Sequence, residues 1–196
     1  MIEPPPADLT LQDATEWTIR ALEDEGFPIL LCGRGALDYQ GEYTGSVDID
    51  LLVGTDFRGA VSVLDAYQSR GDLDLGMGAE GVVRYLVRGG RPVDVLDVSS
   101  VHPRLFDLLR KRCSVPIPLG SAGEVRAVTR EGYCVLAVMI GLRGFAARKR
   151  DPMGKVREAL DLFGERVDRG EVAALLGTLG VRRPWEDLLR PPRDRR

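Results

Sequence analysis

Residues 29–53 read ILLCGRGALDYQGEYTGSVDIDLLV, and this stretch carries the features on which the fold prediction depends. Its first apolar run predicts a buried strand that ends at Cys32, where Gly33 allows a sharp turn. The following residues suffice for a short helix before Gly41, and a second strand with alternating polar and apolar residues ends at Val53. The stretch therefore predicts two strands joined by a glycine turn and a short helix.

The second strand carries a pair of aspartates, Asp48 and Asp50. Side chains two residues apart on a strand project from the same face, so both carboxylates point one way. We expect Val47, Ile49 and Leu51 to point to the core on the other face. Two neighbouring carboxylates repel each other unless a cation lies between them, and oxygen-rich sites of this kind favour Mg²⁺. The pair therefore indicates a metal site.

A third carboxylate on another apolar strand strengthens this interpretation. The run RPVDVLDV, residues 91–98, contains Asp94 and Asp97, which lie on opposite faces of a strand because they are three residues apart. Only one of them can join the pair. A second D-x-D, Asp72 and Asp74, lacks such surroundings, and we expect it on a solvated strand face.

The glycine turn also admits a dinucleotide-binding interpretation. Gly33 and Gly35 match the first two glycines of G-x-G-x-x-G, but Asp38 stands where the third glycine belongs. That glycine normally permits close packing of the helix against the strand, and Asp38 would obstruct it. Gly41 would in addition break the helix, so the sequence disfavours a dinucleotide site.

The rest of the chain predicts an α+β protein in two parts. Helical spacing of apolar residues is found at 8–26, 56–70 and 102–112. Strand-like runs are found at 72–77, 81–87 and 92–98. We expect a mixed β-sheet flanked by helices in a domain that spans residues 1–120.

The pattern becomes helical from residue 129 onward. Helical segments are expected at 129–150, 151–167 and 168–181, followed by a short helix with a basic tail at 182–196. Asp151 and Asp168 are suitable N-cap residues for two of them. We expect residues 121–196 to form a small C-terminal helical bundle.

Composition excludes several classes of protein. A net charge of −3 over 196 residues argues against a general nucleic-acid coat, and no sequence-specific DNA binding is expected. Cys32, Cys113 and Cys134 are far apart and contain no C-x-x-C, so neither a disulfide framework nor a zinc knuckle is indicated. No apolar run approaches membrane length, and we expect a cytoplasmic protein without a membrane partner.

A basic segment stands out in this acidic chain. Such a run is typical of a solvated helix face, and the alternative is a clamp for a triphosphate or for RNA phosphates. Its members are Arg143, Arg148, Lys149, Arg150, Lys155 and Arg157.

Residues 28–98 resemble the nucleotidyltransferase superfamily whose best-known member is DNA polymerase beta. The shared pattern is a strand, a glycine turn, a short helix, D-x-D on the next strand and a third carboxylate on a later strand. More narrowly, the chain is similar to small bacterial nucleotidyltransferases of the abortive-infection and toxin–antitoxin type. Gly33, Ala36, Gly41 and the run DIDLLV fall in place, and Ser46 stands where Thr is usual.

The resemblance implies transfer of a nucleoside monophosphate from a nucleoside triphosphate to a hydroxyl acceptor, with release of pyrophosphate. Asp48, Asp50 and Asp94 would be catalytic and would hold Mg²⁺ or Mn²⁺, with Asp94 hydrogen-bonded to the acceptor hydroxyl or deprotonating it. The acceptor would be tRNA or a protein, and a cognate antitoxin would be a further partner. Nucleotide binding is expected from Gly33, Arg34, Ser46, Arg148, Lys149 and Lys155.

Departures from the family pattern keep two alternatives open. Arg34 replaces a small turn residue, Thr44 stands where Arg is common, and residues 138–140 lack the usual Lys. Together with Gly154, these changes favour a degenerate member that acts as a binding or regulatory module. The other alternative is an antibiotic-modifying nucleotidyltransferase with an aminoglycoside or lincosamide acceptor.

Overall fold

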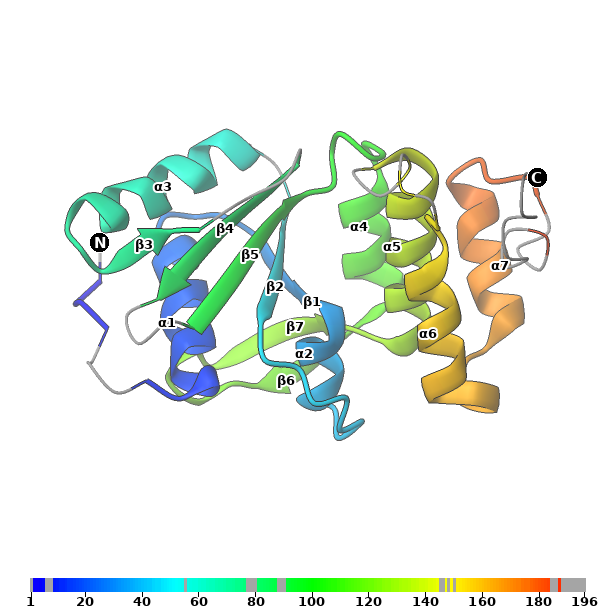
Figure 1. Cartoon of the computed structure of the whole chain (residues 1–196), viewed down its shortest axis with the longest axis horizontal. Helices are drawn as coiled ribbons and strands as arrows, with labels where there is room; N and C mark the ends of the chain where they lie inside the picture. The colour runs from blue at the N-terminus through cyan, green and yellow to red at the C-terminus, as the bar shows by residue number, and fades with distance from the viewer. Residues whose placement is uncertain are drawn as a thin grey trace.

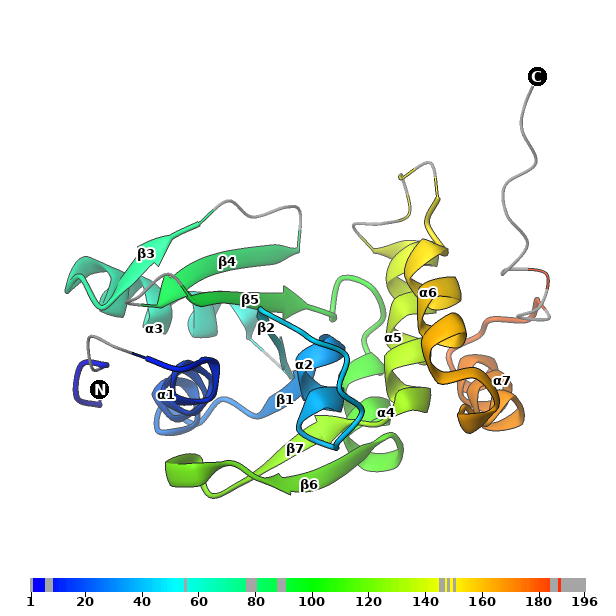
Figure 2. The ribbon, with the colours of Figure 1, turned by 60° about the horizontal axis from the view of Figure 1, so that its bottom comes forward.

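The predicted α+β fold, a mixed β-sheet flanked by helices, is confirmed by a computed structural model of the chain (Figures 1 and 2). The structure describes residues 2–5, 9–54, 56–76, 81–87, 91–144, 147, 149, 151–183 and 187. None of the helices within these ranges is long and apolar enough to cross a membrane.

The sheet has seven strands in the order β3-β4-β5-β2-β1-β7-β6. The β2–β5 and β1–β7 pairs are parallel, and the other neighbouring pairs are antiparallel. The strands are β1 (Ile29–Cys32), β2 (Ile49–Val53), β3 (Leu73–Leu75), β4 (Val82–Val87), β5 (Arg91–Asp97), β6 (Ser114–Pro118) and β7 (Glu124–Val128).

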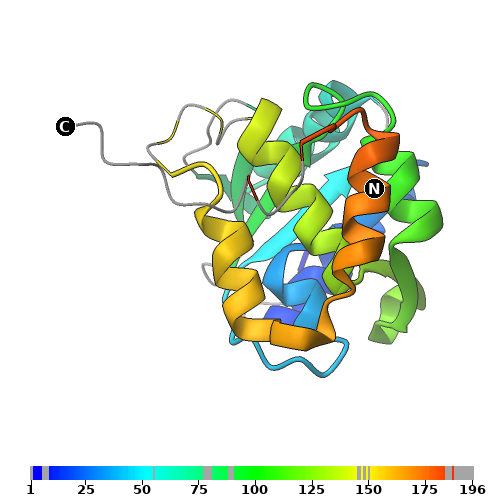
Figure 3. The same cartoon turned by 90° about the vertical axis from the view of Figure 1, so that its right-hand side faces the viewer.

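Helices cover one face of the sheet and one end of it. In Figure 2, α1 lies between β3-β4-β5 and β6-β7, and α3 lies on the same side of the sheet as α1. Figure 3 looks onto the other end, where α5, α6 and α7 lie together. The helices are α1 (Leu11–Glu23), α2 (Gly33–Asp38), α3 (Phe57–Ser69), α4 (Leu105–Arg112), α5 (Arg130–Arg143), α6 (Gly154–Phe163) and α7 (Arg169–Thr178), with 3-10 turns η1 (Gly120–Ala122) and η2 (Gly164–Arg166).

The core packs the sheet against α1 and α3 and continues into α4, α5, α6 and α7. Trp17 of α1 packs edge-on against Tyr67 of α3, with ring centroids 5.0 Å apart. Ile49 and Leu51 are buried, as the alternation in β2 predicted. The prediction for Val47 was wrong: its side chain is 72% exposed, because β2 begins only at Ile49.

The sheet extends beyond residue 120, because β6 and β7 join it after α4. The sequence pattern predicted no strand in this segment. Pro116 and Pro118 lie in β6, and proline is tolerated there because β6 is an edge strand. The division into a domain of residues 1–120 and a helical region of residues 121–196 stays a prediction, to which the structure adds that the sheet continues to Val128.

Local capping interactions explain where several helices begin. Thr10 and Asp13 form a reciprocal capping box at the start of α1, and Thr129 caps α5. The Asp168 cap is confirmed, since its side chain accepts the Glu171 amide at 2.9 Å. The prediction that Asp151 caps the next helix was wrong.

The N-cap of α6 is Met153, and the Asp151 carboxylate instead pairs with Arg157. The helix expected at 182–196 lies almost wholly outside the described residues, which include only 182, 183 and 187 of that segment.

Truncation of a central strand residue should expose the dependence of the fold on this core. Leu31 of β1 is 1% exposed, so Leu31→Ala should lower the free energy of unfolding by about 2–5 kcal/mol. Leu162→Ala is the matched control, because Leu162 is 44% exposed and its loss should cost less than about 0.5 kcal/mol. Urea unfolding followed by circular dichroism measures both, and equal losses would contradict this account of the core.

Candidate metal and nucleotide site

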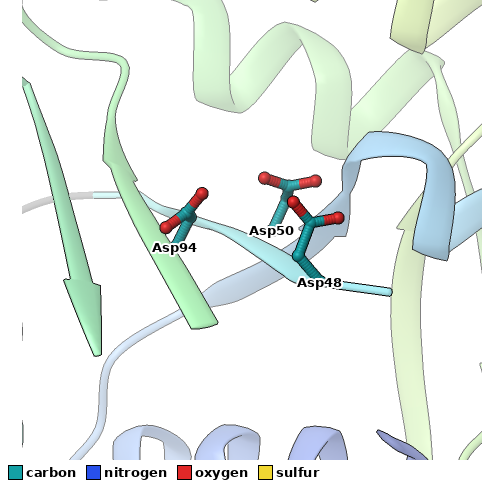
Figure 4. A group of neighbouring side chains, drawn as sticks. All are labelled: Asp48, Asp50 and Asp94. Atoms are coloured by element: carbon teal, nitrogen blue, oxygen red, sulfur yellow. The ribbon is translucent and has the colours of Figure 1, made fainter. Parts of the chain in front are cut away.

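The structure brings Asp48, Asp50 and Asp94 together on one face of the sheet (Figure 4). Asp50 and Asp94 are direct partners in the parallel β2–β5 pair, and Asp48 lies just before β2 on the same face as Asp50. One carboxylate oxygen from each residue lies within 4.8 Å of the others. Three hard oxygen donors at this separation fit a divalent cation such as Mg²⁺.

Asp97, the rival for the third carboxylate, does not join this cluster. Its Oδ1 accepts hydrogen bonds from the amide and the hydroxyl of Ser99, at 2.9 and 2.6 Å, in the turn after β5. The other D-x-D differs from expectation, because Asp72 is buried at 2% exposure with Arg70 Nε 3.1 Å from its Oδ2, and only Asp74 is solvated.

Gly33 is the residue of the glycine turn that packs against the carboxylate cluster, where it lies next to Asp50. Its φ of +69° is a conformation that side chains with a Cβ rarely adopt. A Cβ at this position would lie 1.8 Å from Oδ2 of Asp50. Both the backbone and the space around it therefore require glycine, and Gly35 likewise allows the carbonyl oxygen of Asp48 to approach within 3.2 Å of its Cβ position.

Two side chains order the loop that leads into β2. Ser46 donates its hydroxyl to Oδ1 of Asp48 at 3.0 Å, so in this structure it holds a carboxylate. Asp38 accepts the amides of Thr44 and Ser46, the latter at 2.8 Å. Burial raises the pKa of Asp38, but these hydrogen bonds outweigh burial and leave the pKa below its ordinary value. This role of Asp38 was not predicted from the sequence, in which Asp38 counted only as an obstacle to a dinucleotide site.

The electrostatics of the cluster show that its negative charge is only partly compensated. Burial, followed by the charges of Asp48 and Asp94, raises the pKa of Asp50 to about 7. Burial and the same three carboxylates raise the pKa of the adjacent Cys32 thiol well above its ordinary value. Cys32 therefore stays protonated and is not a nucleophile near neutral pH.

Arg84 of β4 contacts the carboxylate cluster and was not predicted from the sequence as a site residue. Its Nε donates to Oδ1 of Asp94 at 2.6 Å and its Nη2 to Oδ2 of Asp94 at 2.5 Å, a bidentate pair. The same Nη2 lies 3.8 Å from Oδ2 of Asp48. The hydrogen bond to Asp94 and the surrounding charges raise the pKa of Arg84. The sequence signal that could have identified Arg84 is its position inside the otherwise apolar run GVVRYLV, residues 81–87.

A cavity of about 230 Å³ adjoins the carboxylates. One part of its lining is acidic and another is basic, with Arg34, Lys149 and Lys155. Arg34 and Lys155 lie 4.0 and 3.3 Å from the carboxylate of Glu158. Arg148, predicted to bind nucleotide, lies outside the described residues. The apolar part of the lining consists of Leu96, Tyr133, Leu136, Ala137, Ile140 and Pro152.

A methyl group at position 33 should disrupt the site in a way that backbone strain alone does not. Gly33→Ala and Gly41→Ala both place alanine at a positive φ, but a Cβ at Gly41 meets no atom within 4 Å. Strain should cost each variant about 1 kcal/mol, and Gly33→Ala should lose a further 1–3 kcal/mol or more by displacing Asp50. Thermal unfolding measures the difference in stability, and equal losses in the two variants would show that displacing Asp50 costs no stability.

The raised pKa of Asp50 predicts a pH-dependent cost in the metal-free protein. An unfolded Asp50 ionises near 3.8 and the folded one near 7, so the stability it contributes is present at low pH and is lost as pH rises through about 7. In EDTA at pH 8, Asp50→Asn should therefore be more stable than wild type, by on the order of 2–4 kcal/mol.

The gain should shrink as the pH falls and should be smallest at about pH 3, below the ordinary pKa of 3.8, where folded and unfolded Asp50 are both largely protonated. Asp74→Asn is the control for the substitution itself, because it removes an exposed carboxylate from β3. Urea unfolding at a series of pH values measures this dependence, and a gain that is independent of pH would contradict it.

Solved structures with a similar fold include two of ANT(2'')-Ia. Its solution structure, described as that of an antibiotic-resistance factor, covers 89% of this chain and 93% of its own, at 15% identity and a TM-score of 0.53. Its crystal structure in complex with adenylyl-2''-tobramycin covers 88% of this chain and 98% of its own, at 13% identity and a TM-score of 0.51.

An antigenic nucleotidyltransferase-like protein from Paracoccidioides brasiliensis covers 91% of this chain and 90% of its own, at 15% identity. Its TM-score of 0.46 is too low to support an argument. No protein-family model matches the chain, and no curated protein matches it significantly. At these identities the similarity concerns the fold alone, and the chain has a mixed α/β fold of the nucleotidyltransferase type.

Proposed function

We propose that this protein is a Mg²⁺-dependent nucleotidyltransferase, which transfers a nucleoside monophosphate from a nucleoside triphosphate to a hydroxyl acceptor and releases pyrophosphate. The observation that carries the proposal is the convergence of Asp48, Asp50 and Asp94 within 4.8 Å beside a cavity that has a basic wall. The lining of this cavity contains both carboxylates and cations, which suits a metal–triphosphate complex because that complex presents both kinds of charge.

Asp48, Asp50 and Asp94 would hold the divalent cation. When bound, Mg²⁺ neutralises the negative charge that develops on the transferred phosphoryl group and on the leaving pyrophosphate. The raised pKa of Asp50 supports this assignment, because three carboxylates with one guanidinium among them leave the cluster short of positive charge. Cys32 stays neutral and lines the cavity without adding charge to it.

The triphosphate would lie toward Arg34, Lys149 and Lys155. Gly33 would lie at the phosphate end of the site, because it packs against Asp50 at the start of α2, where no side chain caps the helix. Ser46 orients Asp48 through its hydroxyl. Arg148 remains part of the proposal on the basis of sequence.

The nucleoside would pack against the apolar wall that α5 contributes. Burial, followed by the charge of Glu158, raises the pKa of Tyr133 to about 12, so its ring is a neutral surface for a base or a ribose. Asp94 would accept the proton of the acceptor hydroxyl or a hydrogen bond from it, since its carboxylate lies on the open face of the sheet beside Asp50.

The acceptor classes covered by this proposal are tRNA, a protein and a small molecule such as an aminoglycoside or lincosamide antibiotic. The third class draws support from the fold neighbour ANT(2'')-Ia, which was crystallised with adenylyl-2''-tobramycin. A toxin role with a cognate antitoxin follows from the sequence resemblance and belongs to the first two classes.

A non-catalytic binding module is the second candidate, because Arg84 engages both oxygens of Asp94. Such a protein would bind nucleotide or metal without turnover. Release of pyrophosphate in the presence of an acceptor distinguishes the two functions.

Calorimetric titration with each nucleoside triphosphate, with and without Mg²⁺, tests the proposal. Wild type should bind at least one triphosphate in a Mg²⁺-dependent manner, and Asp48→Asn/Asp50→Asn should weaken this binding by about 100-fold or more because the metal ligands are lost. Asp74→Asn is the control, since it removes an exposed carboxylate from β3. Absence of binding to folded wild type would overturn the enzymatic proposal.

A further inference from the structure

We infer that Arg84 is the built-in counter-ion of the three-carboxylate cluster and competes with the divalent cation for Asp94 and Asp48. In the ligand-free protein it stabilises the cluster, and metal binding requires its guanidinium to withdraw. The inference rests on the proposed function, because it concerns the same site.

The sheet places Arg84 at the cluster by strand register. Arg84 lies directly opposite Asp94 in the antiparallel β4–β5 pair, and Asp94 lies opposite Asp50 in the parallel β2–β5 pair. Paired residues project from the same face of a sheet, so all of these side chains share the open face. Gly76 makes room for the stem of Arg84, since a Cβ at that position would lie 2.8 Å from the Arg84 Cγ.

The guanidinium uses the oxygens that a metal would need. Arg84 Nη2 lies 2.5 Å from Oδ2 of Asp94 and 3.8 Å from Oδ2 of Asp48, between two of the three carboxylates. A divalent cation shared by these residues would draw on the same lone pairs at about 2.0–2.1 Å. Two cations at such close range repel each other, so guanidinium and metal cannot both keep full contact with Asp94.

The side chain has space to withdraw. Arg84 is 39% exposed, whereas Asp94 is 13% exposed, so the arginine can exchange its carboxylate partners for water while Asp94 stays in place. Two cations of the cavity lining, Arg34 and Lys155, lie beside Glu158. The carboxylates of the site thus lie beside a cation from β4, and two cations of the cavity lining lie beside a carboxylate from α6.

Mn²⁺ binding, measured by the electron paramagnetic resonance signal of the free ion, tests this competition. Arg84→Gln should bind Mn²⁺ about tenfold more tightly than wild type, because the competing charge is gone while a polar side chain remains. Arg84→Lys should fall between them, since an ammonium cannot form the bidentate pair. Arg70→Met is the matched control, because it removes an arginine that lies beside Asp72 away from the site.

Thermal unfolding supplies an independent readout on the same proteins. Arg84→Gln should melt lower than wild type in EDTA and should gain more from Mn²⁺, whereas Arg70→Met should melt lower without a change in the gain from Mn²⁺. Wild type that binds Mn²⁺ and an Arg84→Gln variant that binds equally or more weakly would overturn the inference and leave the proposed function standing. Absence of Mn²⁺ binding to every variant would overturn both.

Discussion

Repulsion among three carboxylates held within 4.8 Å is the constraint on which the rest of the site depends. Asp50 and Asp94 cannot move apart, because they are neighbours in the sheet and their backbones are fixed by the β2–β5 ladder. The fold therefore compensates for the repulsion locally. Arg84 supplies positive charge, and Asp50 holds its proton up to about pH 7.

The turn at Gly33 is shaped by the same cluster. Asp50 occupies the space that a side chain at position 33 would need, so the end of β1, the start of α2 and the carboxylate form one packed unit. Ser46 and Asp38 then set the path of the loop that delivers Asp48 to this unit. The glycine turn and the paired aspartates thus belong to one site.

The helical part of the chain completes the cavity from the other side. Helix α5 supplies apolar residues such as Tyr133 and Ile140, and Lys155 lies at the start of α6. These helices follow β7, which pairs with β1 in the middle of the sheet. The segment before residue 120 and the segment after it therefore build the sheet together, and the site lies where the sheet meets the helices.

Much of the site could be predicted from sequence because its signals are local. Alternation along a strand places Asp48 and Asp50 on one face whatever the partners of that strand, and Gly33 marks a turn by its own conformational freedom. Which of Asp94 and Asp97 meets them required the pairing of β5 with β2. Helix starts could also be predicted where a capping residue was present, as at Asp168. The same prediction failed at Asp151, because its carboxylate pairs with Arg157.

Tertiary structure decided the remaining features, because they depend on which strands become neighbours. β6 and β7 carry weak strand signals, and their place in the sheet follows from the partnership of β7 with β1. Arg84 is the clearest case: as a residue in an apolar run it has no evident role, and only the β4–β5 register sets it opposite Asp94. Sequence by itself determined the turn and the paired aspartates of the candidate site, because these residues lie close along the chain. The positive charge beside the carboxylates comes from a strand whose register no local pattern specifies.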